Sequence, residues 1–591
     1  MMNAVSSIHC ISANMSPAIS LALYGRGWAL HQLVPFVDKL LGLSGAMDSR
    51  MLGYNDFWLR LPIMLLALIF PTTKVLLIAH AINVASWAYW MPAVWDYMCW
   101  CAILELAFIA AALFGGGDTV VANRAISCLR PMLLILYVSA AFWKLTTGWF
   151  DSYVSCATVL MAELVSSPLF PPGAAMDDFL ATMLLAAPAL VAALEFAVPL
   201  GLWLSPHWGI LLALVFHQTI NLMPMTYAGG FSIAMCCRLI IYLPPSRIEA
   251  ARKTSFSVAL VCAAIVGMNL TLMWTVHGFI DTPGALFVLL TGLYGLAILN
   301  NPEPSKASTT AASAGVTLRG LTCGMAFFYA FLNPVLGIQS MGSSTMYGNV
   351  MQYGVGNHWI LPTFLLQRHY AARSPAELAS LDANASLAEW LDANMVDAFG
   401  GGIVRVESTT SKLMRQLAPA EATAQLPARA QRLLKEVGAG GHYFEMYAAR
   451  NYFDRPLFNL TTSALHVENK QSSPPPGTPT LKYVQPVYEM RRVLALARER
   501  QEEFELTYTK IPTSLQTIRE WRRFEGTQVT YRETAGGSFK CIVREQGSEK
   551  PCASDEIALL PPPPAWLQHI LLPYPIPLVA TDDVDNLYCS T

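Results

Sequence analysis

Long apolar segments with few charges dominate the first 340 or so residues of the chain. A helix needs roughly 20 largely apolar residues to cross a bilayer. Segments of this kind lie at 94–115, 127–145, 179–204, 207–224, 254–276, 284–300 and 318–337. Pro71 and Lys74 divide residues 59–90 into two further segments, and the apolar segment 228–243 is short. The pattern predicts a polytopic α-helical membrane domain of about nine or ten helices.

The N-terminal 55 residues carry a different pattern. Residues 17–43 are amphipathic because Arg26, His31 and Asp38 interrupt them, so this segment either spans the membrane or lies in its interface. Residues 1–15 lack a charged region followed by an apolar run, so no cleavable signal peptide is expected and the first membrane helices would direct targeting. We therefore predict an N-terminal segment at 1–55 and a membrane domain at 56–340.

Charged residues become dense from about residue 366, which predicts an extramembrane domain at 341–591. Residues 428–438 and 486–502 have the spacing of amphipathic helices. Residues 402–406 are typical of a strand, and 527–545 are typical of a hairpin. We therefore expect a mixed α/β, partly β, C-terminal domain.

Composition also indicates that one part of the chain is surrounded by lipid and the other by water. Only 13% of residues are charged and the mean hydropathy is +0.41, whereas a soluble domain carries about 25% charged residues. A net charge of −2 gives no basic footprint for nucleic acid, so no nucleic-acid partner is expected. No Cys/His group has metal-ligand spacing, so no metal is expected. Cys541 and Cys552 could pair if the C-terminal domain is lumenal.

Orientation follows from the positive charges between the predicted spans. The loop 244–253 is basic, and the loop 301–317 carries a lysine with an arginine just beyond it, so both are expected in the cytoplasm. Three spans after residue 253 place the C-terminal domain on the lumenal or outer side. Sequons at Asn384 and Asn459 fall there, as expected of a glycoprotein. We expect the endoplasmic reticulum or another endomembrane.

Ionisable residues inside apolar spans are functional candidates because each costs several kcal/mol in hydrocarbon unless it faces a partner or a cavity. They are His80, Glu105, Arg130, Lys144, Glu195, His217 and Arg238. Lys144 ends the segment 127–145 and is expected on one helical face with Tyr137, Ala140 and Ala141. An amine that loses its hydration there is more readily a neutral base. The alternative is an interfacial lysine that anchors the end of the helix.

His217 and Glu195 have similar alternatives. His217 and Asn221 lie one turn apart on a shared helical face, where a hydrogen-bonded core histidine is the alternative to a functional one. Glu195 has apolar neighbours on every side, so it must be paired, protonated or facing a polar cavity. A structural ion pair fits Glu195 as well as a catalytic role does.

Several of these residues carry a resemblance to the vitamin K-dependent γ-carboxylase family, which shares the HTTM (horizontally transferred transmembrane) domain. The sequence from Tyr137 through Lys144-Leu145 to Trp149 resembles the family signature. Further similar blocks, in the same order, are Glu195 with Pro199, Phe216-His217 with Asn221, Phe231-Ser232, 241–244, 333–337, Asn357-His358 and 488–492. The resemblance covers roughly residues 55–500.

The resemblance implies a reaction. In the family, a lysine deprotonates vitamin K hydroquinone, which reacts with O2; the strong base formed removes a γ-proton from a protein glutamate, and the carbanion captures CO2. Lys144 would be that lysine, with His217 a second catalytic residue. Tyr137, Trp149, Glu195 and Asn221 would bind the isoprenoid quinone. The partners implied are the lipid bilayer and a Glu-containing protein substrate.

Two positions depart from the family pattern. The family carries a histidine used for carboxylation two spans before the lysine, and the matching stretch 94–100 has none. Trp143 stands where the animal enzymes have a second lysine. Three hypotheses therefore stay open: a carboxylase-like enzyme, a relative that performs quinone or lipid redox chemistry without carboxylation, and a non-enzymatic membrane receptor, scaffold or transporter.

Overall fold

The computed structural model describes the chain in ranges separated by gaps. The described residues are 20–34, 36–37, 57–90, 96–152, 155–223, 230–251, 253–278, 280, 282–300, 315–335, 345, 358–361, 402–411, 413–414, 428–437, 442–444, 482–512, 514–515, 518–545, 547–564, 568, 576–579 and 588–590. They belong to two units. The first comprises Met1–Phe142, Glu163–Met176 and Leu190–Ala330, and the second comprises Trp143–Ala162, Asp177–Ala189 and Phe331–Thr591.

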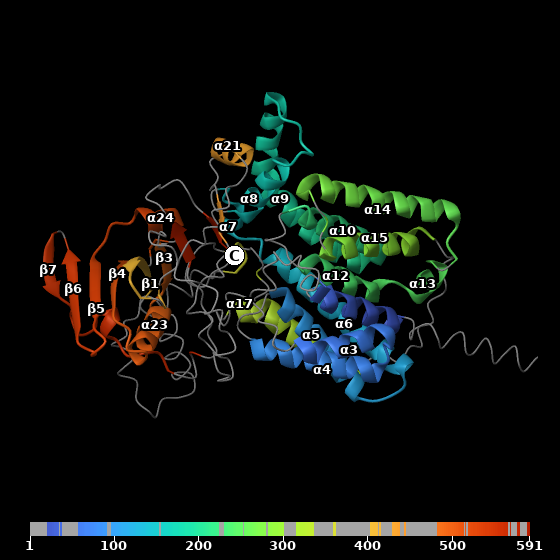
Figure 1. Cartoon of the computed structure of the whole chain (residues 1–591), viewed down its shortest axis with the longest axis horizontal. Helices are drawn as coiled ribbons and strands as arrows, with labels where there is room; N and C mark the ends of the chain where they lie inside the picture. The colour runs from blue at the N-terminus through green and yellow to red at the C-terminus, as the bar shows by residue number, and fades with distance from the viewer. Residues whose placement is uncertain are drawn as a thin grey trace, which may run out of the picture. The chain divides into compact units, whose positions relative to one another are not determined.

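The first unit is helical where it is described (Figure 1). A helical segment at 20–34 is followed by the helices α3 (Phe57–Ile69), α4 (Thr73–Trp90), α5 (Asp96–Leu113), α6 (Asp118–Phe142), α10 (Pro206–Asn221), α12 (Phe231–Leu239), α13 (Pro245–Ala251), α14 (Phe256–His277), α15 (Thr282–Leu299) and α16 (Val316–Phe327). The helices α8 (Cys156–Val165) and α9 (Ala174–Leu204) each belong in part to both units.

Four described helices are long and apolar enough to cross a membrane: α6, α9, α14 and α15. Shorter apolar helices of 10–17 residues lie at Arg60–Ile69, Thr73–Ala88, Tyr97–Leu113, Cys156–Val165 and Phe231–Tyr242. The break predicted at Pro71 is confirmed, since α3 ends at Ile69 and α4 begins at Thr73. The short segment predicted at 228–243 contains α12, which continues as a 3-10 turn to Tyr242.

The helix α14 shows how local sequence sets the ends of such a segment. The hydroxyl of Ser255 accepts a hydrogen bond from the Val258 N–H at the start of the helix. Gly278 ends it in the left-handed conformation, at φ 72°, and donates its N–H to Trp274 O. Between these caps the surface is apolar, and Leu260 and Met268 are more than half exposed. Such a helix keeps its apolar side chains outward, as expected where the surroundings are lipid.

The second unit contains a seven-stranded antiparallel sheet in the order β7-β6-β5-β4-β1-β3-β8 (Figure 1). Its strands are β1 (Ile403–Thr409), β3 (Lys482–Pro486), β4 (Phe504–Ile511), β5 (Gln528–Glu533), β6 (Phe539–Glu545), β7 (Ser548–Pro551) and β8 (Ile576–Val579). A separate parallel pair joins β2 (His442–Phe444) to β9 (Tyr588–Ser590). The predicted β-containing region is therefore an antiparallel sheet with helices.

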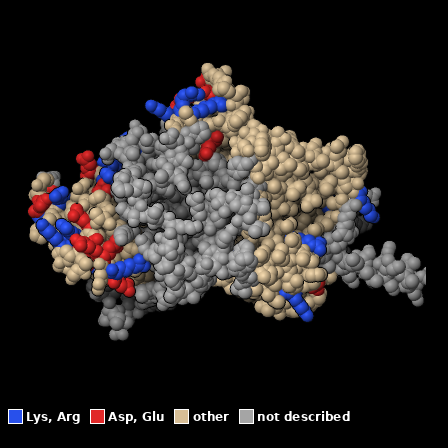
Figure 2. Space-filling view, in the orientation of Figure 1, with Lys and Arg blue, Asp and Glu red and all other residues tan. Residues whose placement is uncertain are grey.

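Three local predictions in this unit are confirmed. The expected helices appear as α21 (Ala428–Glu436) and α23 (Val487–Glu499). The expected hairpin is β5–β6, in which Glu533 pairs with Phe539 across a turn that contains Gly537 at φ 78°. Figure 2 shows charged side chains gathered over the sheet strands, whereas the described helical surface on that face is mostly uncharged.

The sheet core forms because alternate strand residues share a face. Phe504, Leu506 and Tyr508 of β4 are buried with Met490 and Val493 of α23. Burying each large apolar side chain contributes about 1.5–3 kcal/mol, so α23 and the sheet stabilise one another. Burial raises the pKa of the Tyr531 phenol to about 12, and the Glu533 carboxylate, which accepts a hydrogen bond from this hydroxyl at 2.8 Å, adds to the rise.

Cys541 and Cys552 form a disulfide. The pairing, which the sequence left open, links β6 to the residue that follows β7. The Cys552 N–H also donates to Cys541 O at 3.2 Å. The bond therefore fastens the edge strand β7, whose residues are all exposed, to its neighbour.

We expect the double variant Cys541→Ala/Cys552→Ala to loosen the β6–β7 edge. Closing a loop of this size stabilises a native state by about 3 kcal/mol, which corresponds to roughly 100-fold in an opening equilibrium. Hydrogen exchange of β6 and β7 amides should accelerate by that factor. Cys323→Ala, which removes a free thiol from α16, is the control. Unchanged exchange in the double variant would contradict the prediction.

Candidate functional site

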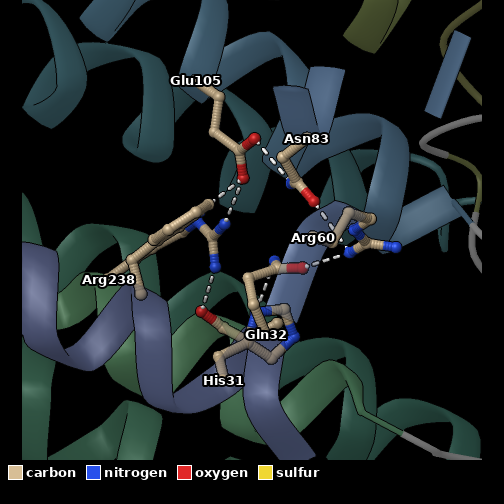
Figure 3. A network of polar contacts seen from close by, with 8 residues as sticks. His31, Gln32, Arg60, Asn83, Glu105 and Arg238 are labelled. Atoms are coloured by element: carbon tan, nitrogen blue, oxygen red, sulfur yellow. Dashed lines mark hydrogen bonds and ion pairs between the residues drawn. The ribbon is translucent and has the colours of Figure 1, made fainter. Parts of the chain in front are cut away.

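A fully buried carboxylate lies at the centre of a polar network in the helical unit (Figure 3). Glu105 of α5 accepts hydrogen bonds from Trp28 Nε1 and Asn83 Nδ2, both at 2.7 Å. It also forms an ion pair with Arg238 of α12, whose Nη2 lies 3.3 Å from Glu105 Oε1. Arg238 Nη1 donates to the backbone oxygen of Ala234 at 2.8 Å. The carboxylate therefore has a donor on each oxygen.

The network continues through Arg60 to the N-terminal helical segment. Arg60 Nη2 donates to Asn83 Oδ1 at 2.9 Å and to Gln32 Oε1 at 3.0 Å. Gln32 Nε2 in turn lies 3.1 Å from His31 Nδ1. The Arg60 guanidinium also lies 5.1 Å from the centre of the Trp87 ring, a cation–π geometry. Polar residues from distant parts of the sequence are thus tied into one interior cluster.

His80 and Tyr24 adjoin this cluster among aromatic rings. His80 is fully buried, and its ring meets the edges of Trp28 at 4.5 Å and Phe108 at 4.6 Å. Within the described ranges, the two ring nitrogens of His80 and the hydroxyl of Tyr24 have no hydrogen-bond partner. The contacts of His80 in this structure are therefore ring–ring contacts with its aromatic neighbours.

Two residues predicted at the site come together in the same unit. The hydroxyl of Tyr137 on α6 lies 2.9 Å from His217 Nε2 on α10. The Phe231 ring packs against His217 with centroids 5.1 Å apart, and Ser232 Oγ donates to His217 O at 3.4 Å. Tyr137 and His217 are 4% and 0% exposed. This is a hydrogen-bonded pair shielded from water.

Asn221 and Glu195 are half-buried. Asn221 ends α10, and its backbone oxygen accepts a hydrogen bond from His277 Nε2 at 2.9 Å. As far as the chain is described, Asn221 Nδ2, both amide atoms of Gln218 and His217 Nδ1 are buried without a partner. These atoms can hydrogen-bond a polar group brought by a ligand. Glu195 lies on α9, in a stretch assigned to the helical unit.

Lys144 and Trp149 lie in the second unit, Lys144 in a turn after α6 and Trp149 in the short helix that follows it. The predicted helical face through Tyr137 and Lys144 is wrong, because α6 ends at Phe142. The chain reverses through a hydrogen bond from Thr146 N to Lys144 O at 2.9 Å. Thr146 then caps α7 (Thr147–Phe150) by accepting from Trp149 N at 3.0 Å. A new helix start therefore competes with continuation of α6.

The turn nevertheless buries the lysine. Lys144 is 2% exposed, and its Nζ lies 5.0 Å from the centre of the Trp149 ring. Trp149 is held in place by its Nε1, which donates to Pro188 O at 2.9 Å. An ammonium over an indole face gains about 0.5–2 kcal/mol. Two of the predicted residues thus form a buried cation–π pair.

Sequence reasoning missed most of the Glu105 network. It flagged Glu105 and Arg238 as ionisable groups inside apolar spans but did not pair them, and it did not name Trp28, Gln32 or Asn83. Arg60 was the available signal, since a guanidinium inside the apolar α3 needs a partner. Among the described residues, no group of three or more His, Cys, Asp or Glu residues could hold a metal ion.

Comparison with known proteins adds one match. A domain family of unknown function (DUF8388) matches residues 356–569. This range includes the sheet from β1 to β7 together with α21 and α23. No curated protein matches the chain. No solved structure matches it.

We expect Glu105→Gln to destabilise the helical unit by about 3–5 kcal/mol, because breaking a buried pair leaves the Arg238 charge uncompensated. Arg238→Met should cost a similar amount, and the double variant Glu105→Gln/Arg238→Met should recover part of the loss. Denaturant titration of the purified protein in one detergent measures these differences. Glu549→Gln is the control, since its pair with Arg544 is exposed and such pairs contribute about 0–1 kcal/mol. Strictly additive losses would contradict the pairing.

Proposed function

We propose that the chain is a multi-pass membrane enzyme similar to the vitamin K-dependent γ-carboxylases, with Lys144 as the base toward a reduced quinone. The observation that carries the proposal is the burial of Lys144, at 2% exposure, in an aromatic turn. An amine there is shielded from bulk water, so a proton that it takes up does not exchange readily with solvent. The Trp149 face would hold the ammonium once it forms.

The residues assigned to the quinone fit a group with an apolar ring and polar oxygens. In the helical unit Tyr137 has an aromatic ring, and the amide nitrogen of Asn221 is a donor without a partner among the described residues. Trp149 is assigned to the quinone by the resemblance alone. Glu195 and the Tyr137–His217 pair add acceptors. A quinol hydroxyl has both donor and acceptor capacity, so it would satisfy such atoms. The reduced quinone would supply the reducing power for O2.

The remaining assignments follow the same resemblance. O2 and CO2 would be the small co-substrates, and a Glu-containing protein would be the acceptor. The domain at 341–591 would hold that protein, while the membrane helices would take up the isoprenoid chain. His217, hydrogen-bonded to Tyr137, would serve as a second proton-handling group.

The disulfides support a lumenal C-terminal domain. Cys541 and Cys552 are bonded to each other, and Cys156 is also disulfide-bonded. Disulfides persist in oxidising compartments, so both the segment after α6 and the C-terminal domain are assigned to that side. The basic loop 244–253 then lies three proposed spans from each and falls in the cytoplasm. The endoplasmic reticulum or another endomembrane fits this orientation. The sequons at Asn384 and Asn459 lie outside the described residues.

A second candidate is quinone or lipid redox chemistry without carboxylation. It is favoured by the stretch 94–100, which has no histidine where the carboxylases use one. His80, the nearest alternative in sequence, packs among aromatic rings in this structure. The burial of Lys144 is equally compatible with this candidate.

The test is carboxylation in isolated membranes with vitamin K hydroquinone, labelled bicarbonate and a Glu-rich peptide. We expect incorporation by the wild type and a loss of about 100-fold or more in Lys144→Met, which removes the base but keeps an apolar side chain of similar length. Lys74→Met is the matched control, because Lys74 is exposed at the start of α4.

Equal incorporation by the wild type and Lys144→Met would exclude Lys144 as the base. Quinol-dependent O2 uptake without incorporation would favour the second candidate. If neither activity appears in well-folded protein, the proposal of an enzyme is wrong.

A further inference from the structure

A short segment from the C-terminal part of the chain braces the turn that carries Lys144. Thr146 and His358 form an antiparallel bridge, and Trp359 N donates to Leu145 O at 2.9 Å. Both segments belong to the second unit. The residue directly after Lys144 is therefore hydrogen-bonded through its backbone oxygen to this segment.

Aromatic packing adds to the backbone pairing. The His358 ring meets Trp143 at 5.3 Å in an edge-to-face arrangement. The Phe150 and Trp359 rings stack at 4.5 Å with 19° between their planes. These contacts bracket the turn, since Trp143 precedes Lys144 and Phe150 ends α7. Edge-to-face and stacked ring pairs at these separations are favourable arrangements, so both contacts help to fix the turn.

His358 also folds its own segment. Its Nδ1 accepts the N–H groups of Ile360 and Leu361, both at 3.1 Å. This reproduces the way an Asn or Asp side chain caps its own turn. Because Nδ1 is the acceptor, a neutral His358 carries its proton on Nε2. At 4% exposure the ring is excluded from solvent, so one side chain sets both the shape of the segment and its contact with Trp143.

We propose that His358 is a positioning residue for Lys144, which it serves by holding the turn 143–146 through the brace 358–361. The proposal rests on the proposed function, in which Lys144 is the base. A base must be held within a fraction of an ångström of its productive position, and misplacement by about 1 Å can cost 100-fold in rate. His358 supplies that constraint from a part of the chain more than 200 residues away.

The test compares three variants in the full-length protein in membranes. His358→Ala removes the acceptor and the ring, His358→Asn keeps an acceptor at the position of Nδ1, and His358→Gln instead extends an amide toward the position of Nε2. We expect His358→Ala to lower kcat for quinol oxidation by about 10- to 100-fold with little change in KM. His358→Asn should recover most of the rate, and His358→Gln should not. Ile360→Ala is the control, since its side chain is 62% exposed and its N–H is retained.

A second readout does not depend on activity. The rate at which an amine-reactive probe labels Lys144 is measured by mass spectrometry of the same membranes. Loss of the two hydrogen bonds that His358 Nδ1 accepts should raise labelling roughly 30-fold in His358→Ala, and His358→Asn should label like the wild type.

The outcomes separate the two claims. If the wild type shows no quinol activity but Lys144 is labelled faster in His358→Ala than in the wild type, the proposed function is rejected and the positioning role is kept. Unchanged labelling and unchanged kcat in His358→Ala would overturn the inference. Recovery by His358→Gln but not by His358→Asn would also overturn it, because Nε2 would then act directly.

Discussion

The helical unit depends on how it accommodates the buried carboxylate of Glu105. A charge removed from water costs several kcal/mol unless donors replace its hydration. Trp28, Asn83 and Arg238 supply those donors from the N-terminal segment, α4 and α12. A shift of one of these helices by a single turn would leave the carboxylate or the guanidinium unsatisfied. Apolar helices alone slide easily against one another, so this polar cluster specifies one register among them.

The same reasoning applies to the proposed chemistry. The Tyr137–His217 pair is buried in the helical unit, and Lys144 is buried against Trp149 in the other. Each is a group that can hold or move a proton in a setting from which water is excluded. The Lys144 turn is held by two elements that both follow it in the sequence, namely the Pro188 oxygen that anchors Trp149 and the brace at 358–361. A rigid support of this kind is what a positioned base requires.

Local features were predictable where a single physical rule decided them. The break at Pro71, the hairpin around Gly537 and the helix α23 follow from proline, glycine and amphipathic spacing in short windows. The pairing of β1 with both β3 and β4 was not predictable, because it joins strands far apart in sequence. For Lys144 the sequence left a desolvated position and an interfacial position open. The residue is buried, but its predicted helical face was wrong, since Thr146 starts a new helix.

The candidate site shows the same division. Hydropathy alone identified Glu105, Arg238, Lys144 and His217 as ionisable groups in apolar surroundings. It could not assign their partners, because Asn83, Trp28 and His358 have no distinctive pattern of their own. His358 was noticed only as part of a resemblance, and its contacts with the Lys144 turn depend on a tertiary pairing. The sequence thus shows which buried ionisable residues need a partner, whereas the tertiary structure determines which residue that partner is.

The most direct test of the account is quinol oxidation by the purified protein in lipid nanodiscs. Consumption of O2 is followed after addition of vitamin K hydroquinone, without peptide or bicarbonate, so that only the action of the base on the quinol is measured. We expect O2 uptake by the wild type and by Lys74→Met, and its loss in Lys144→Met. Uptake that persists in Lys144→Met, or no uptake by the folded wild type, would contradict the role of Lys144 as the base toward the quinol.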